Sequence, residues 1–324
     1  MSNPEKSPSV EVCDGSGTPV AQLLTAREVP LGGLRAMPVR RTLPQRARSL
    51  IGAWCFVDHY GPDDVSVTGG MGVAGHPHTG LQTVSWLFSG EIEHRDTIGS
   101  HASIRPGQMN LMTAGSGIAH SEYSTSATTM LHGAQLWVAL PDEFRETAPA
   151  FEHYSPTPVD VDGASVLVFL GSLLGSTSPV TTFTPLIGAE VTLRPGQTLD
   201  VPVDPVYEHG VLIDTGSATI AGVEAKRSEL VYQPTGCSML TLRGADDEAT
   251  RVLVLGGEPL GEQILMWWNF VGRTQEEVTA YREAWERERA GSSGGGRYGD
   301  FPESWEETIP APALPASVRL KMRG

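Results

Sequence analysis

The chain has 324 residues, which is long for a single hydrophobic core and suits two domains of ordinary size. Its formal charge of −15 argues against direct binding to nucleic acid, which needs clustered lysine and arginine. Hydrophobic residues make up 40% of the chain, yet no apolar run reaches the ~18 residues of a membrane span. We therefore expect a folded protein that neither crosses a membrane nor binds DNA or RNA.

The first residues and the cysteines favour a cytoplasmic location. Residues 1–6 are polar and lack the apolar core of a signal peptide. Cys13, Cys55 and Cys237 are odd in number and far apart, which predicts neither a disulfide framework nor a CxxC zinc site. Cysteines of this kind are typical of a reducing compartment.

Short strand-like segments, without helical periodicity, fill the first half of the chain. The 37 glycines and 24 prolines suit strands and turns. We expect strands at residues 39–43, 53–57, 84–88, 91–95, 109–112 and 135–140, with a turn at 61–64. Val84, Trp86 and Phe88 alternate onto one face, and Ser89-Gly90 predicts a hairpin that joins this strand to residues 91–95.

The second half has the same character from about Ser165. We expect strands at residues 166–170, 189–193, 211–214, 218–220, 230–233, 238–242 and 252–255. Turns at Pro195-Gly196, Thr215-Gly216 and Thr235-Gly236 space them at the intervals of a β-barrel or sandwich. We interpret the two halves as one fold used twice.

One helix is expected near the C-terminus. Thr274 and Glu277 form a capping box, and Val278, Tyr281 and Trp285 make an apolar stripe. The tail beyond the helix is rich in Gly and Ser and then in Pro and Ala, so it is expected to be extended or partly disordered.

Two pairs of potential metal ligands bracket residues 76–122. In His76-Pro77-His78 and His120-Ser121-Glu122 the paired side chains stand at i and i+2, and therefore share one face of a strand. Two neighbouring strands of this kind bring three imidazoles and one carboxylate to one point. Nitrogen and oxygen ligands without thiolate predict a first-row divalent cation. Iron(II) is favoured, because six-coordination leaves room for substrate or oxygen, whereas zinc tends to stop at four ligands.

The other histidines carry weaker signals. His94 and Asp96 form a third i, i+2 pair, which would either orient a metal ligand or make a local hydrogen bond. The remaining histidines lack a partner at metal spacing and are expected to be structural or solvent-facing: His59, His101, His132, His153 and His209. The second half contains a single histidine and no His-X-His, so we expect it to hold no metal.

The sequence around the ligand pairs resembles the pirin family of the cupin superfamily. His76-Pro77-His78 is followed by Thr83-Val84-Ser85-Trp86-Leu87 and His94-Arg95-Asp96, and the second pair ends the run MTAGSGIAHSE at 112–122. Further pirin-like motifs occupy residues 56–62, 135–138, 257–260 and 267–271. The likeness extends from about residue 39 to residue 290, and its central block is specific to pirins.

This resemblance implies an all-β fold of two tandem cupin β-barrels (a bicupin), followed by a C-terminal helix and an extended tail. It divides the chain into a lead-in (1–27), an N-terminal metal-binding barrel (28–155), a C-terminal barrel without metal (156–273), and the helix and tail (274–324). The iron ligands of the family map onto His76, His78, His120 and Glu122, the same four residues that spacing selects.

The resemblance also implies a choice of functions. Some pirins are similar to flavonol 2,3-dioxygenases, which open quercetin with O2 and release carbon monoxide. In that reaction the metal binds the flavonol hydroxyl as its anion, and Glu122 accepts the proton as a general base. Trp86, Phe56 and Met112 are candidate walls for such an aromatic substrate, although core packing explains them equally well. The alternative is a non-enzymatic iron protein whose redox state regulates a protein partner, and a third option is a cupin isomerase or hydrolase with the same ligands.

Two positions near the ligands depart from the usual pirin pattern. Thr79 stands where pirins often carry arginine, and Gln82 stands where they often carry glutamate. Glu122 is then the one carboxylate that the motif places at the metal. The motif therefore supplies no second acid or base beside the metal.

Overall fold

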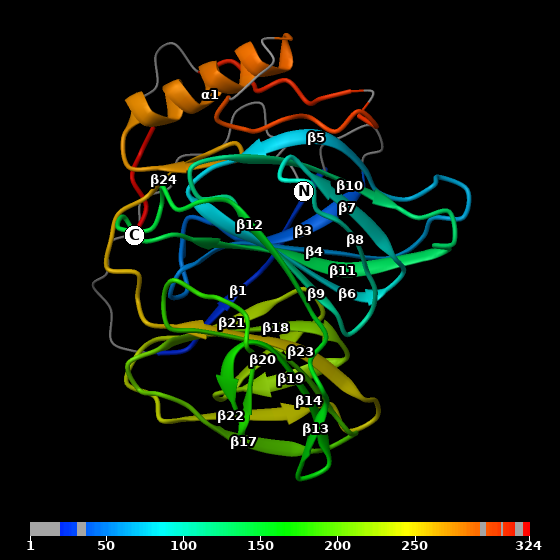
Figure 1. Ribbon diagram of the computed structural model, residues 1–324. Coiled ribbons are helices and arrows are strands. Elements are labelled where there is room, and N and C mark those ends of the chain that lie inside the picture. Colours follow the sequence, from blue (N-terminus) through cyan, green and yellow to red (C-terminus); the bar gives the residue numbers. More distant parts are fainter. Residues whose placement is uncertain (1–19, 31–36, 292–295, 306, 315–319) are drawn as a thin grey trace.

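The computed structural model describes residues 20–30, 37–291, 296–305, 307–314 and 320–324. Two β-barrels are stacked one above the other, and a helix lies over the first barrel on the side away from the second (Figure 1). The expected all-β architecture of two tandem barrels with a C-terminal helix is confirmed. No helix within the described ranges is long and apolar enough to cross a membrane.

The first barrel consists of a seven-stranded and a four-stranded antiparallel sheet. In spatial order the larger sheet contains β12 (Ala150–Tyr154), β9 (Met109–Thr113), β6 (Leu81–Ser89), β11 (Met130–Ala139), β4 (Trp54–Asp64), β3 (Pro38–Leu43) and β2 (Arg27–Pro30). The smaller sheet contains β5 (Gly72–His78), β10 (Ile118–Ser124), β7 (Ile92–Asp96) and β8 (His101–Ile104). Both candidate ligand pairs therefore lie on the smaller sheet.

The second barrel repeats this plan with an eight-stranded and a four-stranded sheet. The larger sheet contains β1 (Gln22–Leu24), β21 (Leu230–Gln233), β18 (Glu208–Thr215), β23 (Thr250–Gly257), β16 (Leu186–Leu193), β14 (Ala164–Leu173) and β13 (Val159–Val161), with β15 (Ser176–Thr177) beside β14. The smaller sheet contains β17 (Thr198–Pro202), β22 (Met239–Gly244), β19 (Ser217–Ile220) and β20 (Val223–Lys226). Since β1 pairs with β21, the chain contacts the second barrel before it enters the first.

The two larger sheets pack against each other through an apolar interface. Val84, Trp86 and Phe88 of β6 share one face, as expected, and join a buried cluster with side chains of the second barrel. Among these, the rings of Trp86 and Phe169 stack with centroids 4.6 Å apart. Leu87, on the opposite face of β6, packs with core residues of the first barrel. The strand alternation of β6 thus separates the barrel interface from the barrel interior.

Two turn predictions in the first half are wrong. The Ser89-Gly90 turn does not make a hairpin, because β6 pairs with β9 and β11, whereas β7 pairs with β8 and β10 of the other sheet. Gly90, with a φ of 89°, instead turns the chain from one sheet into the other. Residues 61–64 are the last part of β4 and remain paired with β11 up to Asp64. The register shifts there, because Gly61 and Pro62 of β4 lie opposite the single residue His132 of β11.

The predicted helix is present as α1 (Gln275–Arg289). It begins as expected, because the Thr274 hydroxyl oxygen accepts a hydrogen bond from the backbone N–H of Glu277 at 3.1 Å. Its apolar stripe, which includes Tyr281 and Trp285, is buried. The stripe covers a hairpin of two short strands, β24 (Leu265–Trp267) and β25 (Phe270–Gly272).

The described part of the tail contains turns at 297–298 and 303–304 and returns to the first barrel. The backbone N–H of Ile309 donates to the carbonyl oxygen of Gly75 in β5 at 2.8 Å. Trp305 lies against the same glycine. The prediction of partial disorder falls on residues 292–295, 306 and 315–319, which lie outside the described residues.

Candidate metal centre

β5 and β10 bring the two predicted ligand pairs together. In their antiparallel register His76 lies opposite His120, and His78 lies opposite Ile118. Because residues at i and i+2 share a face, the imidazoles of His76 and His78 both project toward His120. The three ring centroids lie 4.4 to 5.1 Å apart, and all three side chains are fully buried.

The three imidazoles present the donor atoms of a metal site. Their Nε2 atoms are buried and have no hydrogen-bond partner among the described residues. One ring nitrogen from each histidine lies within 4.8 Å of those from the other two. Buried polar atoms normally have partners, and a cation at this point would satisfy all three nitrogens at once. The residues present therefore fit a first-row divalent metal.

Burial also sets the protonation state of these histidines. It lowers the pKa of His76 to about 3. It holds the pKa of His78 and His120 well below the usual range, and the neighbouring His76 adds to the shift. The imidazoles are therefore neutral at pH 7, which is the state that binds a metal.

Hydrogen bonds on the remote ring nitrogens orient two of the imidazoles. His76 donates from Nδ1 to the carbonyl oxygen of Ala74 at 2.9 Å, which leaves its Nε2 as a free lone pair. The Nδ1 atom of His120 lies 3.2 Å from Nδ1 of His94, whose Nε2 lies 3.1 Å from Asp96 Oδ2. The predicted local hydrogen bond of His94 with Asp96 is thus confirmed, and His94 also contacts a candidate ligand.

Glu122 borders the same cluster on the His94 side. Its carboxylate lies within 4.8 Å of ring nitrogens of His94 and His120, so His120 belongs to both groups. A register shift between His120 and Glu122 interrupts the pairing of β10 with β5. Ser85 of β6 donates from its hydroxyl to Glu122 Oε1 at 3.1 Å. The four predicted residues therefore lie in one buried cluster, with the carboxylate at its edge.

Two polar residues next to Glu122 are absent from the sequence prediction. Ser85 lies on the interior face of β6, and the alternation of that strand was a signal that could have found it. Tyr60 lies on β4, where eight consecutive residues are buried, so no alternation of polar and apolar residues could mark it. Burial, followed by the charge of Glu122, raises the pKa of Tyr60 well above its usual value, so its phenol stays protonated.

The candidate wall residues for an aromatic substrate are core residues. Trp86 lies at the barrel interface, where its indole N–H donates to Glu190 Oε2 at 2.8 Å. Phe56 stacks on Trp137 with centroids 4.0 Å apart, and Trp137 in turn meets His78 edge-on at 5.2 Å. Met112 packs in the same core cluster as Phe56 and Trp137. Two other rings border the histidines: Trp137 against His78, and Phe151, which stacks on His94 with centroids 4.7 Å apart.

The two departures from the pirin pattern lie outside the cluster. The amide nitrogen of Gln82 donates to Thr113 Oγ1 at 2.9 Å and to the carbonyl oxygen of Thr181 at 3.3 Å. Gln82 thus points toward the barrel interface, on the face of β6 that carries Val84. Thr79 is buried, and its carbonyl oxygen accepts from the backbone N–H of Val271 at 3.1 Å.

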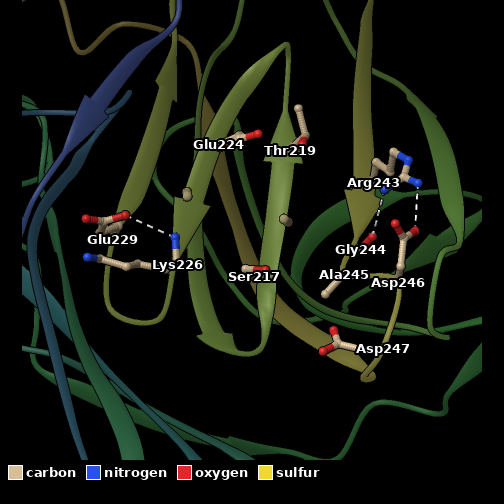
Figure 2. Close-up of a pocket in the computed structure, with 12 residues that line it drawn as sticks. Ser217, Thr219, Glu224, Lys226, Glu229, Arg243, Gly244, Ala245, Asp246 and Asp247 are labelled. Atoms are coloured by element: carbon tan, nitrogen blue, oxygen red, sulfur yellow. Dashed lines mark hydrogen bonds and ion pairs between the residues drawn. The ribbon is translucent and has the colours of Figure 1, made fainter.

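A groove of about 590 Å³ in the second barrel is a different kind of site (Figure 2). It runs along β19, β20 and β22, and Arg243 pairs there with Asp246 at 2.7 Å. Across the groove the backbone N–H of Lys226 donates to the Glu229 carboxylate at 3.0 Å. None of the potential metal-ligand groups within the described residues lies in this groove. The buried cluster of the first barrel is therefore the stronger candidate for chemistry.

The sequence matches the model of the pirin family over residues 36–138 and that of the pirin C-terminal cupin domain over residues 188–291. The chain belongs to the pirin family. The two matched regions fall one on each barrel, so the fold of this pirin is that of two cupin domains in tandem.

Related proteins cover most of the chain. A Pseudomonas aeruginosa protein, provisionally named quercetin 2,3-dioxygenase, is 41% identical over 298 residues, which are 92% of this chain and 91% of the relative. A pirin-like protein of Caulobacter vibrioides is 34% identical over 274 residues, covering 82% of this chain and 92% of the relative. The crystal structure of a quercetin 2,3-dioxygenase from Acinetobacter baumannii superposes with a TM-score of 0.85 at 38% identity, covering 93% of this chain and 97% of that one.

Proposed function

We propose that this pirin is a metal-dependent dioxygenase that opens flavonol-like substrates with O2. The observation that supports it is the convergence of three buried imidazoles, those of His76, His78 and His120, whose Nε2 atoms have no protein partner among the described residues. The 38% identity to the Acinetobacter quercetin 2,3-dioxygenase points to the substrate class. We propose that these three histidines and Glu122 hold the metal, and that the metal is iron(II).

The side chains around the cluster suit this chemistry. A bound divalent metal would lower the pKa of a coordinated flavonol hydroxyl and supply the reactivity toward oxygen. Glu122 accepts the hydroxyl proton on its carboxylate, and the hydrogen bond from Ser85 holds that carboxylate in place. His94 and Asp96 hold His120 in the tautomer that leaves Nε2 free. Burial of the cluster excludes water from the reacting atoms.

The test combines metal content with flavonol consumption. Protein loaded anaerobically with iron(II) is exposed to air and quercetin, and the loss of the flavonol's visible absorbance is followed. We expect turnover by the wild type, none by a folded His120→Ala variant that has lost its metal, and wild-type turnover by a His153→Ala control. Loading with manganese, cobalt or nickel in place of iron identifies the active metal.

A negative result is equally informative. An unchanged quercetin spectrum with iron bound overturns the dioxygenase proposal for this substrate. In that case the redox-regulated protein partner becomes the function to test, by capture of a partner that depends on the oxidation state of the iron. A His120→Ala variant with full metal occupancy would remove His120 from the ligand set.

A further inference from the structure

A second group of potential metal ligands lies where the two barrels meet. His59 of β4 and His132 of β11 belong to the first barrel, and Asp214 of β18 belongs to the second. The two Nε2 atoms lie 3.2 Å apart. Both face Asp214 Oδ1, at 2.8 Å from His59 and 2.6 Å from His132. All three side chains are buried, so their polar atoms contact one another and not solvent.

Strand alternation aims these side chains at the interface between the barrels. His132 stands two residues before Ala134 on β11, and Asp214 stands two residues after Leu212 on β18; both neighbours belong to the apolar cluster that the two barrels share. His59 stands likewise two residues after Val57 on β4. The three side chains therefore lie on the faces of the larger sheets that pack together, and there they meet.

Neighbouring groups hold the remote atoms of the cluster. The Ser228 hydroxyl lies 2.9 Å from His59 Nδ1, and Arg251 donates from Nε to Asp214 Oδ2 at 2.6 Å. Ser228 has a φ of 66°, a strained value for a residue other than glycine. Because these contacts occupy the remote atoms, His59 Nε2 and Asp214 Oδ1 face each other. Hydrogen-bond partners behind metal ligands orient them in the same way.

We propose that His59, His132 and Asp214 bind a second divalent cation, zinc(II) as the first choice, which joins the two barrels. Two imidazole nitrogens, one carboxylate oxygen and a water complete the four-coordinate set that zinc prefers. The 3.2 Å between the Nε2 atoms matches nitrogens bound to one zinc at ~2.0–2.1 Å with near-tetrahedral angles. On binding, the carboxylate oxygen moves outward by about 0.5–0.7 Å, because 2.6 and 2.8 Å are shorter than the distance between two ligands of one zinc. The metal takes the place of any proton on the two Nε2 atoms, so each imidazole keeps its single proton on Nδ1, where that of His59 donates to Ser228.

The experiment isolates this site from the first one. Full-length chain with His76→Ala and His120→Ala is dialysed against zinc, and the bound metal is measured. We expect about one zinc per chain, and none after Asp214→Asn is added. A His153→Ala change in place of Asp214→Asn keeps the zinc. Zinc raises the unfolding temperature of the double variant and leaves that of the triple variant unchanged.

A second measurement uses the chain with its first site intact. Cobalt(II) is bound in place of zinc, and we expect the intense visible absorption of a four-coordinate cobalt site. Either Asp214→Asn or His132→Gln should remove this absorption, while one equivalent of metal stays bound at the first site. A folded double variant that takes up no zinc overturns the proposal. So does an Asp214→Asn change that leaves the metal content of the otherwise wild-type chain unaltered. The cluster is then a hydrogen-bond network between the barrels.

Discussion

The Nδ1 atoms of His94 and His120 lie 3.2 Å apart, so one imidazole donates to the other. Asp96 decides which of the two imidazoles is the donor. Its Oδ1 accepts from the backbone N–H groups of Ile98 and Ser100, and its Oδ2 lies 3.1 Å from His94 Nε2. His94 therefore carries its proton on Nε2, accepts on Nδ1 from His120, and leaves His120 Nε2 free to bind a metal.

Replacing Asp96 by asparagine should weaken the first metal site. The asparagine amide can donate to His94 Nε2, which would reverse the proton order along the chain of hydrogen bonds and place a proton on His120 Nε2. We expect the metal affinity to fall by roughly 10–100-fold, as for other outer partners of metal ligands. Competition against a chromophoric chelator measures the change. His101→Gln is the matched control, because His101 is exposed on the neighbouring strand β8 and should leave the affinity unaltered.

Restoring the family's glutamate as Gln82→Glu should affect stability and not metal content. The new carboxylate would lie at the barrel interface beside the Thr181 carbonyl oxygen, which now accepts from the Gln82 amide. The Thr181 carbonyl oxygen would lose its hydrogen-bond donor and face a buried negative charge. This should lower the free energy of unfolding by about 1–3 kcal/mol. Urea denaturation and metal analysis on the same samples check both parts. A gain in bound metal would show that residue 82 reaches the metal after all.

Glu190 should make the barrel interface sensitive to pH. Burial raises its pKa above the ordinary 4.5, although the hydrogen bond from Trp86 opposes the shift. The folded state therefore holds the proton more tightly than the unfolded state. The stability that comes from tighter binding of this proton is fully present below pH 4.5, and it is lost as the pH rises through the higher pKa of the folded state.

The Glu190→Gln variant isolates that contribution. It keeps an acceptor for Trp86 and has no charge to bury. The difference in unfolding free energy between variant and wild type should therefore grow with pH above 4.5, in favour of the variant. Urea titrations at several pH values measure this difference. Parallel stability curves for the two proteins would contradict the assignment.

A methyl group at Gly75 should displace the tail from β5. A side chain there would overlap the six-membered ring of Trp305, which packs directly on this glycine beside His76. We expect Gly75→Ala to increase proteolytic cleavage of the tail. In a Trp305→Ala background the same change should add little, because the overlapping ring is gone. Equal effects of Gly75→Ala in both backgrounds would mean that Trp305 does not hold the tail.

Local patterns predicted those features that depend on residues close together in the sequence. The i, i+2 spacing placed His76 and His78 on one face, and the capping residues of α1 marked its first turn correctly. The same alternation assigned Trp86 to a shared face with its neighbours. Periodicity says which side chains share a face, and a helix cap depends on a few consecutive residues.

The sequence could not predict which strands pair or where bulges interrupt them. The Ser89-Gly90 turn satisfies the local rules of a hairpin, yet packing sends β6 and β7 into different sheets. Glu122 lies at the edge of the histidine cluster because a register shift follows His120. These outcomes depend on contacts with distant strands, which a local period does not encode.

The sequence by itself determined the family, the ligand types and the faces on which they stand. The tertiary structure alone decided that His59 and Asp214, 155 positions apart, share a hydrogen bond across the two barrels. Neither residue has a ligand partner at i+2, so no spacing marks them as a site. Their meeting depends on how two separately folded sheets pack, and that packing follows from the complementary shapes of many apolar side chains and not from any short motif.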